Sequence, residues 1–139
     1  MTPDEVARRC ADLMWADDKA SQALNVTIEH ITPGAADVSM MVRETMTNGH
    51  GMCHGGYIFT LADTAFAFAC NTYNQRCVAQ HGSIAFVAPA HLGMRLRASA
   101  RERQRSGRSG VYDVTVTEDS GAVVAEFRGL SRTVAGTFF

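Results

Sequence analysis

The chain has 139 residues, of which 46% are hydrophobic and 19% charged, and its formal net charge is -1. A chain of this length most economically forms one domain, residues 1–139, and its nearly neutral charge gives no reason to expect a nucleic acid or a membrane as partner. The low charged fraction suggests that part of the surface is buried in an oligomer. The polar start MTPDEVARRC is unlike a signal peptide, and the four cysteines lack disulfide-scaffold or CxxC spacing, so we expect a cytoplasmic protein with reduced thiols.

The first third of the chain predicts a helix and a hairpin. Residues 3 to about 20 place their apolar side chains on one helical face, with acidic residues in the first turn. Two segments with alternating apolar residues, 23–32 and 35–44, lie on either side of Pro33-Gly34. Alternation around a Pro-Gly turn is typical of two antiparallel strands.

The rest of the chain predicts one buried helix and then four strands. A helix over about residues 55–71 is rich in Ala, Leu and Phe on every side, as in a helix enclosed by protein. Strands grouped after a helix, with hairpin-length turns, favour an α+β domain with an antiparallel sheet. One curved sheet covers only one side of the helix, so a second subunit is expected to cover the rest. The four strand segments are 83–89, 94–104, 110–119 and 122–134.

A loop rich in glycine and histidine, NGHGMCHGG, precedes this helix. Gly55 and Gly56 stand where unpaired N–H groups leave the first turn, and such groups can polarise a carbonyl and hold the oxyanion formed when it is attacked. For two glycines alone, a tight turn without a ligand is the simpler explanation. Asn48 offers an amide able to orient a water or a carbonyl. His54 can act as a base, as a donor or by bonding backbone groups to hold the turn, and we favour the last role.

Asp63 is a carboxylate within the apolar helix. Burying it unpaired costs several kcal/mol or raises its pKa, so it is either satisfied by Thr60, Thr64 or a backbone N–H, or it is functional. It lies eight residues after Gly55, roughly 12 Å along the helix axis at 1.5 Å per residue. Asp63 therefore meets a small reacting centre at Gly55 only if that glycine belongs to an antiparallel copy of the helix in a second subunit.

Three other patterns carry weaker signals. Cys53 beside His54 lacks a third orienting group for a cysteine nucleophile. A metal site made from the loop and later Cys and His residues matches no structural zinc spacing, so we expect no metal. RSGRSG, residues 105–110, has backbone N–H groups, hydroxyls and Arg108 that suit a phosphate, although an ordinary polar hairpin explains it as well. The residues of the rejected metal pattern are His50, Cys53, His54, Cys77 and His81.

The stretch NGHGMCHGGYIFTLADTAFAFACN resembles the signature of hotdog-fold acyl-CoA thioesterases, and within them the phenylacetate-degradation subgroup. In that subgroup Asn is followed six residues later by His-Gly-Gly and then by Leu-Ala-Asp-x-Ala-Phe-Ala. GVYDVTV and FRGLSR near the C-terminus are also similar to that subgroup. The resemblance implies an antiparallel sheet wrapped around the long helix, dimers that commonly pair into homotetramers, and no cofactor, since coenzyme A is part of the substrate.

The resemblance also implies a role for each matching residue. Asp63 matches the catalytic carboxylate, which acts as general base on water or as nucleophile toward the thioester. Gly55 matches the residue whose N–H polarises the thioester carbonyl, and that glycine comes from the other subunit. Asn48 matches the amide that helps to hold the water or the substrate, and His54 the histidine beside the carbonyl. The expected substrate-binding residues are Gly56, Tyr57, Ser83, Gly107, Arg108 and Ser109.

One departure and two rival functions stay open. Some relatives have Ser or Thr near the reacting centre at the start of the strand after the helix, where this chain has AQHGSIAF, so Gln80, His81 and Ser83 are all candidates to face the site. The sequence predicts an enzyme, a thioesterase that hydrolyses phenylacetyl-CoA or a ring-hydroxylated form to the free acid and CoA. The rivals are a hotdog dehydratase, which needs a different acid/base pair, and a non-catalytic acyl-CoA-binding protein, against which the intact site residues argue.

Overall fold

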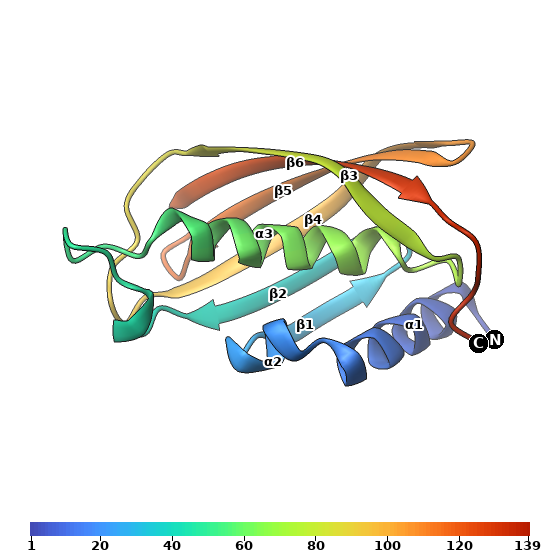
Figure 1. Ribbon diagram of the computed structural model, residues 1–139, viewed down its shortest axis with the longest axis horizontal. Coiled ribbons are helices and arrows are strands. Elements are labelled where there is room, and N and C mark those ends of the chain that lie inside the picture. Colours follow the sequence, from blue (N-terminus) through green and yellow to red (C-terminus); the bar gives the residue numbers. More distant parts are fainter.

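Six antiparallel strands form one sheet that curls around a single long helix (Figure 1). The computed structural model describes all residues from 1 to 139. The strand order is β1-β2-β4-β5-β6-β3, so β1 and β3 are the edge strands. This arrangement confirms the predicted α+β class and the antiparallel sheet wrapped around a helix. The elements are α1 (Pro3–Asp17), α2 (Lys19–Ala23), β1 (Thr27–Thr32), β2 (Ala35–Met41), the 3-10 turn η1 (Glu44–Met46), α3 (Gly55–Cys70), β3 (Cys77–Phe86), β4 (Arg95–Ser106), β5 (Ser109–Glu118) and β6 (Val123–Thr133).

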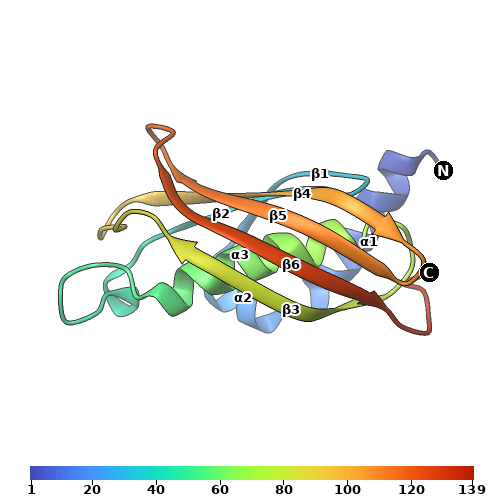
Figure 2. The same cartoon turned by 90° about the horizontal axis from the view of Figure 1, so that it is seen from above.

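The core lies between α3 and the concave face of the sheet, which arches over the helix (Figure 2). Leu61, Phe66 and Phe68 of α3 are at most 1% exposed and belong to the same apolar cluster as the inward side chains of the central strands. The helix comes very close to β6 at Gly129, where a Cβ atom would lie 2.8 Å from three ring atoms of Phe66. A glycine is required there because any side chain would push the helix off the sheet.

The helix predicted over residues 3 to about 20 is two helices. α1 begins with a capping box, in which Thr2 Oγ1 accepts from the Glu5 N–H and the Glu5 carboxylate accepts from the Thr2 N–H. Asp18 follows α1 and accepts from the Ser21 N–H at 3.0 Å, which starts α2. One continuous helix was therefore a wrong prediction, because Asp18 caps a new helix instead of extending the first.

The predicted strands are all present, but two of them begin elsewhere. β1 starts at Thr27, because residues up to Ala23 belong to α2 and Asn25 turns the chain with a φ of 54°. β3 starts at Cys77 and not at residue 83. Its first half shows no alternation because β3 is a largely exposed edge strand with a bulge between Ala79 and His81.

Glycines make the predicted hairpin turns possible. Gly34 joins β1 to β2 with a φ of 72°, and Gly107 joins β4 to β5 with a φ of 57°. Both angles lie in the left-handed region that glycine enters without steric cost. None of the helices combines the length and the apolar character that a membrane-spanning helix needs.

Candidate active site

The N-terminal end of α3 leaves one backbone donor free. His54 caps the helix, and its Nδ1 accepts a hydrogen bond from the Gly56 N–H at 2.9 Å. The Gly55 N–H, by contrast, donates to no atom of the chain. This confirms that His54 bonds the backbone to hold the turn. Because Nδ1 accepts, the neutral ring carries its proton on Nε2, where it can donate to a ligand.

Asn48 organises the loop before the helix. Its Oδ1 accepts from the N–H groups of His50 at 2.9 Å and of Met52 at 3.2 Å, so the amide oxygen is used within the loop. The Nδ2 group donates to no protein atom and keeps two N–H bonds for a ligand or a water. The loop is also tied to its surroundings by a backbone bond from Cys53 to Ala90.

Two depressions flank the glycines at the start of α3. On the Gly55 side, a pocket of about 530 Å³ is lined almost entirely by apolar side chains. On the Gly56 side, a more open depression of about 440 Å³ is lined by His54, Gly56, Tyr57 and Thr60. A carbonyl bound at the Gly55 N–H would therefore have an apolar space next to it, which suits the acyl side of a thioester. The apolar pocket is lined by Met52, Cys53, Gly55, Ile58, Phe86, Val87, Ala88, Pro89 and Ala90.

Asp63 has no hydrogen-bond or salt-bridge partner in the chain. The threonines that were candidates to satisfy it are engaged elsewhere: Thr60 Oγ1 donates to Gly56 O at 2.9 Å, and Thr64 Oγ1 lies 3.3 Å from Ser21 Oγ of α2. Burial raises the pKa of the Asp63 carboxyl, with no nearby cation to offset it. The structure therefore rules out the explanation that Asp63 is a satisfied core carboxylate within one subunit.

Asp63 lies on a partly open side of α3. Gly56, Thr60, Asp63 and Ala67 follow one another at helical spacing and are all at least partly exposed, and from Leu61 to Cys70 all the other residues of the helix are buried. We call these four residues the open stripe. Asp63 is eight residues from Gly55, roughly 12 Å along the axis, so one subunit does not bring the two together.

The three residues that were candidates to face the reacting centre take different positions on β3. They are Gln80, His81 and Ser83. Ser83 pairs with Arg128 and lines a shallow depression with Asp113 on the convex face, away from α3. His81 pairs with Leu130 on that same face, while Gln80 is the unpaired residue of the bulge. The position of Ser83 gives its predicted substrate contact no support within one subunit.

Gln80 lies on the part of β3 that passes Asp63. β3 runs antiparallel to α3: Phe86 lies against Gly55, and Cys77 is bonded to Asn71 just after the helix. Asp63 is midway between Gly55 and Asn71, so the middle of β3, which contains Gln80, His81 and Gly82, lies at its level.

The predicted phosphate turn lies far from Gly55. Residues 105–109 are exposed at the tip of the β4–β5 hairpin, near the opposite end of the molecule from the start of α3 (Figure 1). Gly107 and Arg108 form the two-residue loop, and Ser106 pairs with Ser109. Arg105 stacks on the Tyr73 ring, with its guanidinium carbon 3.7 Å from the ring centroid. Arg108 has no acidic partner and keeps its charge available.

Two features of the site were missed from the sequence. Phe86 and Val87 line the apolar pocket although they follow Gly55 by about thirty residues, and only the strand order brings them there. Ser21, which follows the helix predicted over residues 3 to about 20 and was given no role, is 1% exposed and bonded to Thr64. No group of three or more His, Cys, Asp or Glu side chains is placed to hold a metal ion, and all four cysteines are free thiols.

The sequence and the fold both match known proteins. A family model described as the thioesterase superfamily matches residues 50–125. The acyl-coenzyme A thioesterase PaaI of Escherichia coli (strain K12) is 41% identical over 127 residues, 91% of each chain. The solved structure of the E. coli PaaI protein from the phenylacetic acid degradation operon has a TM-score of 0.96 at 39% identity, covering 98% of this chain and 99% of that one.

A second solved structure is more distant. It is a mutant of the phenylacetic acid degradation protein PaaI from Thermus thermophilus, with a TM-score of 0.81 at 36% identity, covering 84% of this chain and 100% of that one. The matches include α3 and the sheet, the elements that carry the candidate site.

Proposed function

The chain belongs to the thioesterase superfamily and has its hotdog fold, and from this premise we propose that it hydrolyses an arylacetyl-CoA to the free acid and CoA. The observation that carries the proposal is the unpaired carboxylate of Asp63 on the open stripe of α3. An enzyme that attacks a thioester needs a base or a nucleophile and a donor for the oxyanion. Asp63 supplies the first, and the free Gly55 N–H supplies the second.

In the proposed reaction the thioester carbonyl accepts a hydrogen bond from the Gly55 N–H. Asp63 of the partner subunit removes a proton from water as the water oxygen attacks the carbonyl carbon. The tetrahedral intermediate carries its negative charge at Gly55, and its collapse expels the thiolate of CoA, which takes up the proton. Direct attack by the Asp63 carboxylate, followed by hydrolysis of the resulting anhydride, is equally compatible with this arrangement. His54 Nε2–H and Asn48 Nδ2 are the further donors for the carbonyl and the water.

A homodimer completes the proposed site. The open stripe leaves α3 uncovered along Gly56, Thr60, Asp63 and Ala67, and the edge strand β3 is exposed along most of its length. An antiparallel partner helix on the stripe would cover both and bring Asp63 of one subunit to Gly55 of the other. Pairing of such dimers into tetramers, like a cytoplasmic location, stays a prediction.

Two features support the substrate class. The apolar pocket beside Gly55 suits an apolar acyl group, and its volume of about 530 Å³ accommodates an aromatic ring. Two of the relatives are described as PaaI proteins of phenylacetic acid degradation. At the other end of the substrate, Gly107, Arg108 and Ser109 offer backbone N–H groups, a guanidinium and a hydroxyl for the phosphates of CoA. The proposed reaction requires no metal and no separate cofactor.

Replacing the carboxylate tests the proposal directly. Asp63→Asn keeps the size of the side chain but removes its charge and basicity, so kcat/KM for phenylacetyl-CoA should fall roughly 10²- to 10⁴-fold. The release of free thiol from phenylacetyl-CoA measures the rate. The native mass should stay that of wild type and the variant should be at least as stable, because Asp63 makes no hydrogen bond or ion pair in the chain.

Asp119→Asn is the matched control. It makes the same chemical change at an exposed turn residue without a bonded partner and should keep the wild-type rate. A purified Asp63→Asn protein that hydrolyses phenylacetyl-CoA as fast as this control would show that Asp63 is not the catalytic carboxylate.

A further inference from the structure

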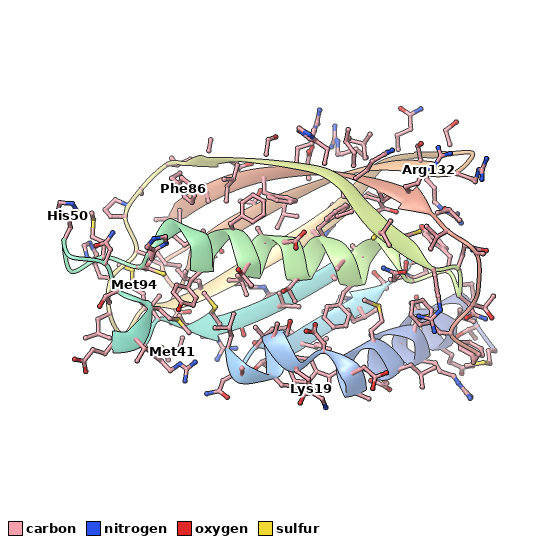
Figure 3. All side chains as sticks on the ribbon, viewed as in Figure 1. Lys19, Met41, His50, Phe86, Met94 and Arg132 are labelled. Atoms are coloured by element: carbon pink, nitrogen blue, oxygen red, sulfur yellow. The ribbon has the colours of Figure 1, made fainter.

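Phe86 places an aromatic ring directly against the start of α3. It is the last residue of β3 and pairs with Ala125, so its side chain points to the concave face of the sheet. A Cβ atom on Gly55 would lie 2.9 Å from Phe86 Cζ and 3.1 Å from Cε1. The ring therefore occupies the space that the glycine leaves open, next to the free Gly55 N–H. Figure 3 shows Phe86 extending from β3 near this end of α3.

The ring is packed on one side only. Phe86 is 55% exposed in the chain, although its ring touches the helix. Val87 beside it is 59% exposed and lines the same pocket, so the two side chains form a continuous exposed apolar surface at the pocket, the kind of patch that marks a binding site or an interface. The free part of the ring borders the apolar pocket of about 530 Å³.

Phe86 is also the only aromatic residue that lines this pocket. The other side chains are aliphatic or contain sulfur, among them Met52, Ile58 and Val87, and none is charged. Such walls accept any apolar group according to its size. Within one subunit, Phe86 is therefore the side chain of this pocket that can favour an aromatic group over an aliphatic one of equal size.

We propose that Phe86 is the specificity-determining residue that selects an aromatic acyl group. This inference rests on the proposed function and names the contact that sets its substrate class. When the carbonyl oxygen lies at the Gly55 N–H, the ring of an arylacetyl group is only one methylene away from the carbonyl carbon. The substrate ring then enters the pocket beside Phe86, where the two rings can pack in an offset or edge-to-face arrangement.

A pair of substrates isolates the aromatic contribution. Phenylacetyl-CoA and cyclohexylacetyl-CoA differ only in the saturation of a six-membered ring, so both fill the pocket but only one has a π system. The measured quantity is the ratio of their kcat/KM values. Since an aromatic pair contributes more than its buried area alone, Phe86→Leu should lower this ratio roughly two- to tenfold relative to wild type. Phe86→Tyr keeps the aromatic face and should keep the ratio.

Phe139→Leu is the matched control, since Phe139 is 42% exposed and does not line the pocket. It should leave the ratio and both rates unchanged. An active Phe86→Leu enzyme with the wild-type ratio would overturn the inference, and so would a parallel fall for both substrates accompanied by a loss of the dimer in native mass spectrometry. If the wild-type enzyme hydrolyses neither substrate, the proposed function itself is wrong, which is a distinct outcome.

Discussion

At its C-terminal end α3 is tied to the sheet by polar groups that all find partners, whereas at its N-terminal end a backbone donor and a loop amide are left free. Asn71, which is 4% exposed, accepts from the Cys77 N–H at 2.8 Å and donates to Ala67 O at 2.9 Å. Next to it, Thr72 Oγ1 accepts from the Gly34 N–H at 2.8 Å and donates to Ala69 O at 3.0 Å.

This C-terminal, closed end of α3 continues into a partly buried hydrogen-bond cluster. Glu102 accepts from the hydroxyl groups of Tyr73 at 3.0 Å and of Tyr112 at 2.8 Å. Burial, together with the hydrogen bond to Glu102, raises the pKa of Tyr73 to about 12, so this hydroxyl stays a donor at any physiological pH. One helix thus separates two tasks: saturated hydrogen bonds at one end fix its position, and unsatisfied groups at the other are available to a substrate.

Among the changes at the two ends of α3, removing the free donor should have the largest effect. Gly55 is the first residue of α3, a position where proline fits, and His54 has the extended φ and ψ of -60° and 132° that a following proline requires. Gly55→Pro deletes the N–H, so kcat should fall roughly 10²- to 10³-fold, as for loss of one oxyanion donor. Gly55→Ala is the matched control, because it adds the same Cβ against Phe86 but keeps the N–H. Single-turnover rates with phenylacetyl-CoA measure both.

Mixing two inactive variants tests whether the two halves of the site come from different subunits. After unfolding and refolding together, Asp63→Asn and Gly55→Pro chains form mixed dimers in which one site has both an intact Asp63 and an intact Gly55. With random pairing, about a quarter of the wild-type activity should return. Activity that stays at the level of the separate variants would place both groups in the same subunit and contradict the dimeric site.

At the closed end of α3, removal of a hydrogen-bonding side chain should lower the stability and leave catalysis unchanged. Asn71→Ala removes three hydrogen bonds to backbone groups and leaves the Cys77 N–H without its acceptor, so the free energy of unfolding should fall by about 2–3 kcal/mol. Asn71 is eight residues from Asp63, roughly 12 Å along the axis, so kcat of the folded enzyme should not change. Urea unfolding and steady-state kinetics at 25 °C measure the two quantities.

Asn48→Ala makes the identical substitution at the open end. Its hydrogen bonds hold an exposed loop, so we expect a smaller loss of stability and a clear fall in kcat/KM. An Asn71→Ala enzyme that keeps its stability but loses kcat would show that the two ends do not divide the tasks in this way.

The sequence predicts most of the features at the N-terminal, open end of α3 and few of those at its C-terminal, closed end. The helix near residues 55–71, the free N–H of Gly55 and the bond from His54 to the backbone all follow from local rules of helix starts, which depend on neighbouring residues. The lack of a partner for Asp63 was one of two alternatives, and the structure settles it because Thr60 donates to Gly56 O and Thr64 bonds to Ser21 of α2.

The parts that escaped prediction depend on pairing between distant segments. Phe86 reaches Gly55 because β3 joins the sheet beside β6 and runs antiparallel to α3. The cluster at Glu102 joins residues from three segments, and nothing in their local sequence indicates that they meet. The early start of β3 was missed because an exposed edge strand with a bulge has no alternating pattern.

The pH dependence set by Asp63 gives the smallest effect, and its sign is opposite for activity and for stability. The pKa of Asp63 is raised by burial, so a proton binds more tightly to the folded state than to the unfolded chain. The carboxylate is needed as base or nucleophile, and kcat/KM should therefore fall about tenfold, or about 1.4 kcal/mol, per pH unit below that raised pKa. Stability should respond in the opposite direction: wild type should be less stable than Asp63→Asn at neutral pH, and the difference should shrink as the pH falls through the raised pKa of the folded state. Titrating both proteins by urea unfolding from pH 8 to pH 4 checks the sign, and a difference that grows on acidification would mean that Asp63 is stabilised as an anion by a partner in the assembled enzyme.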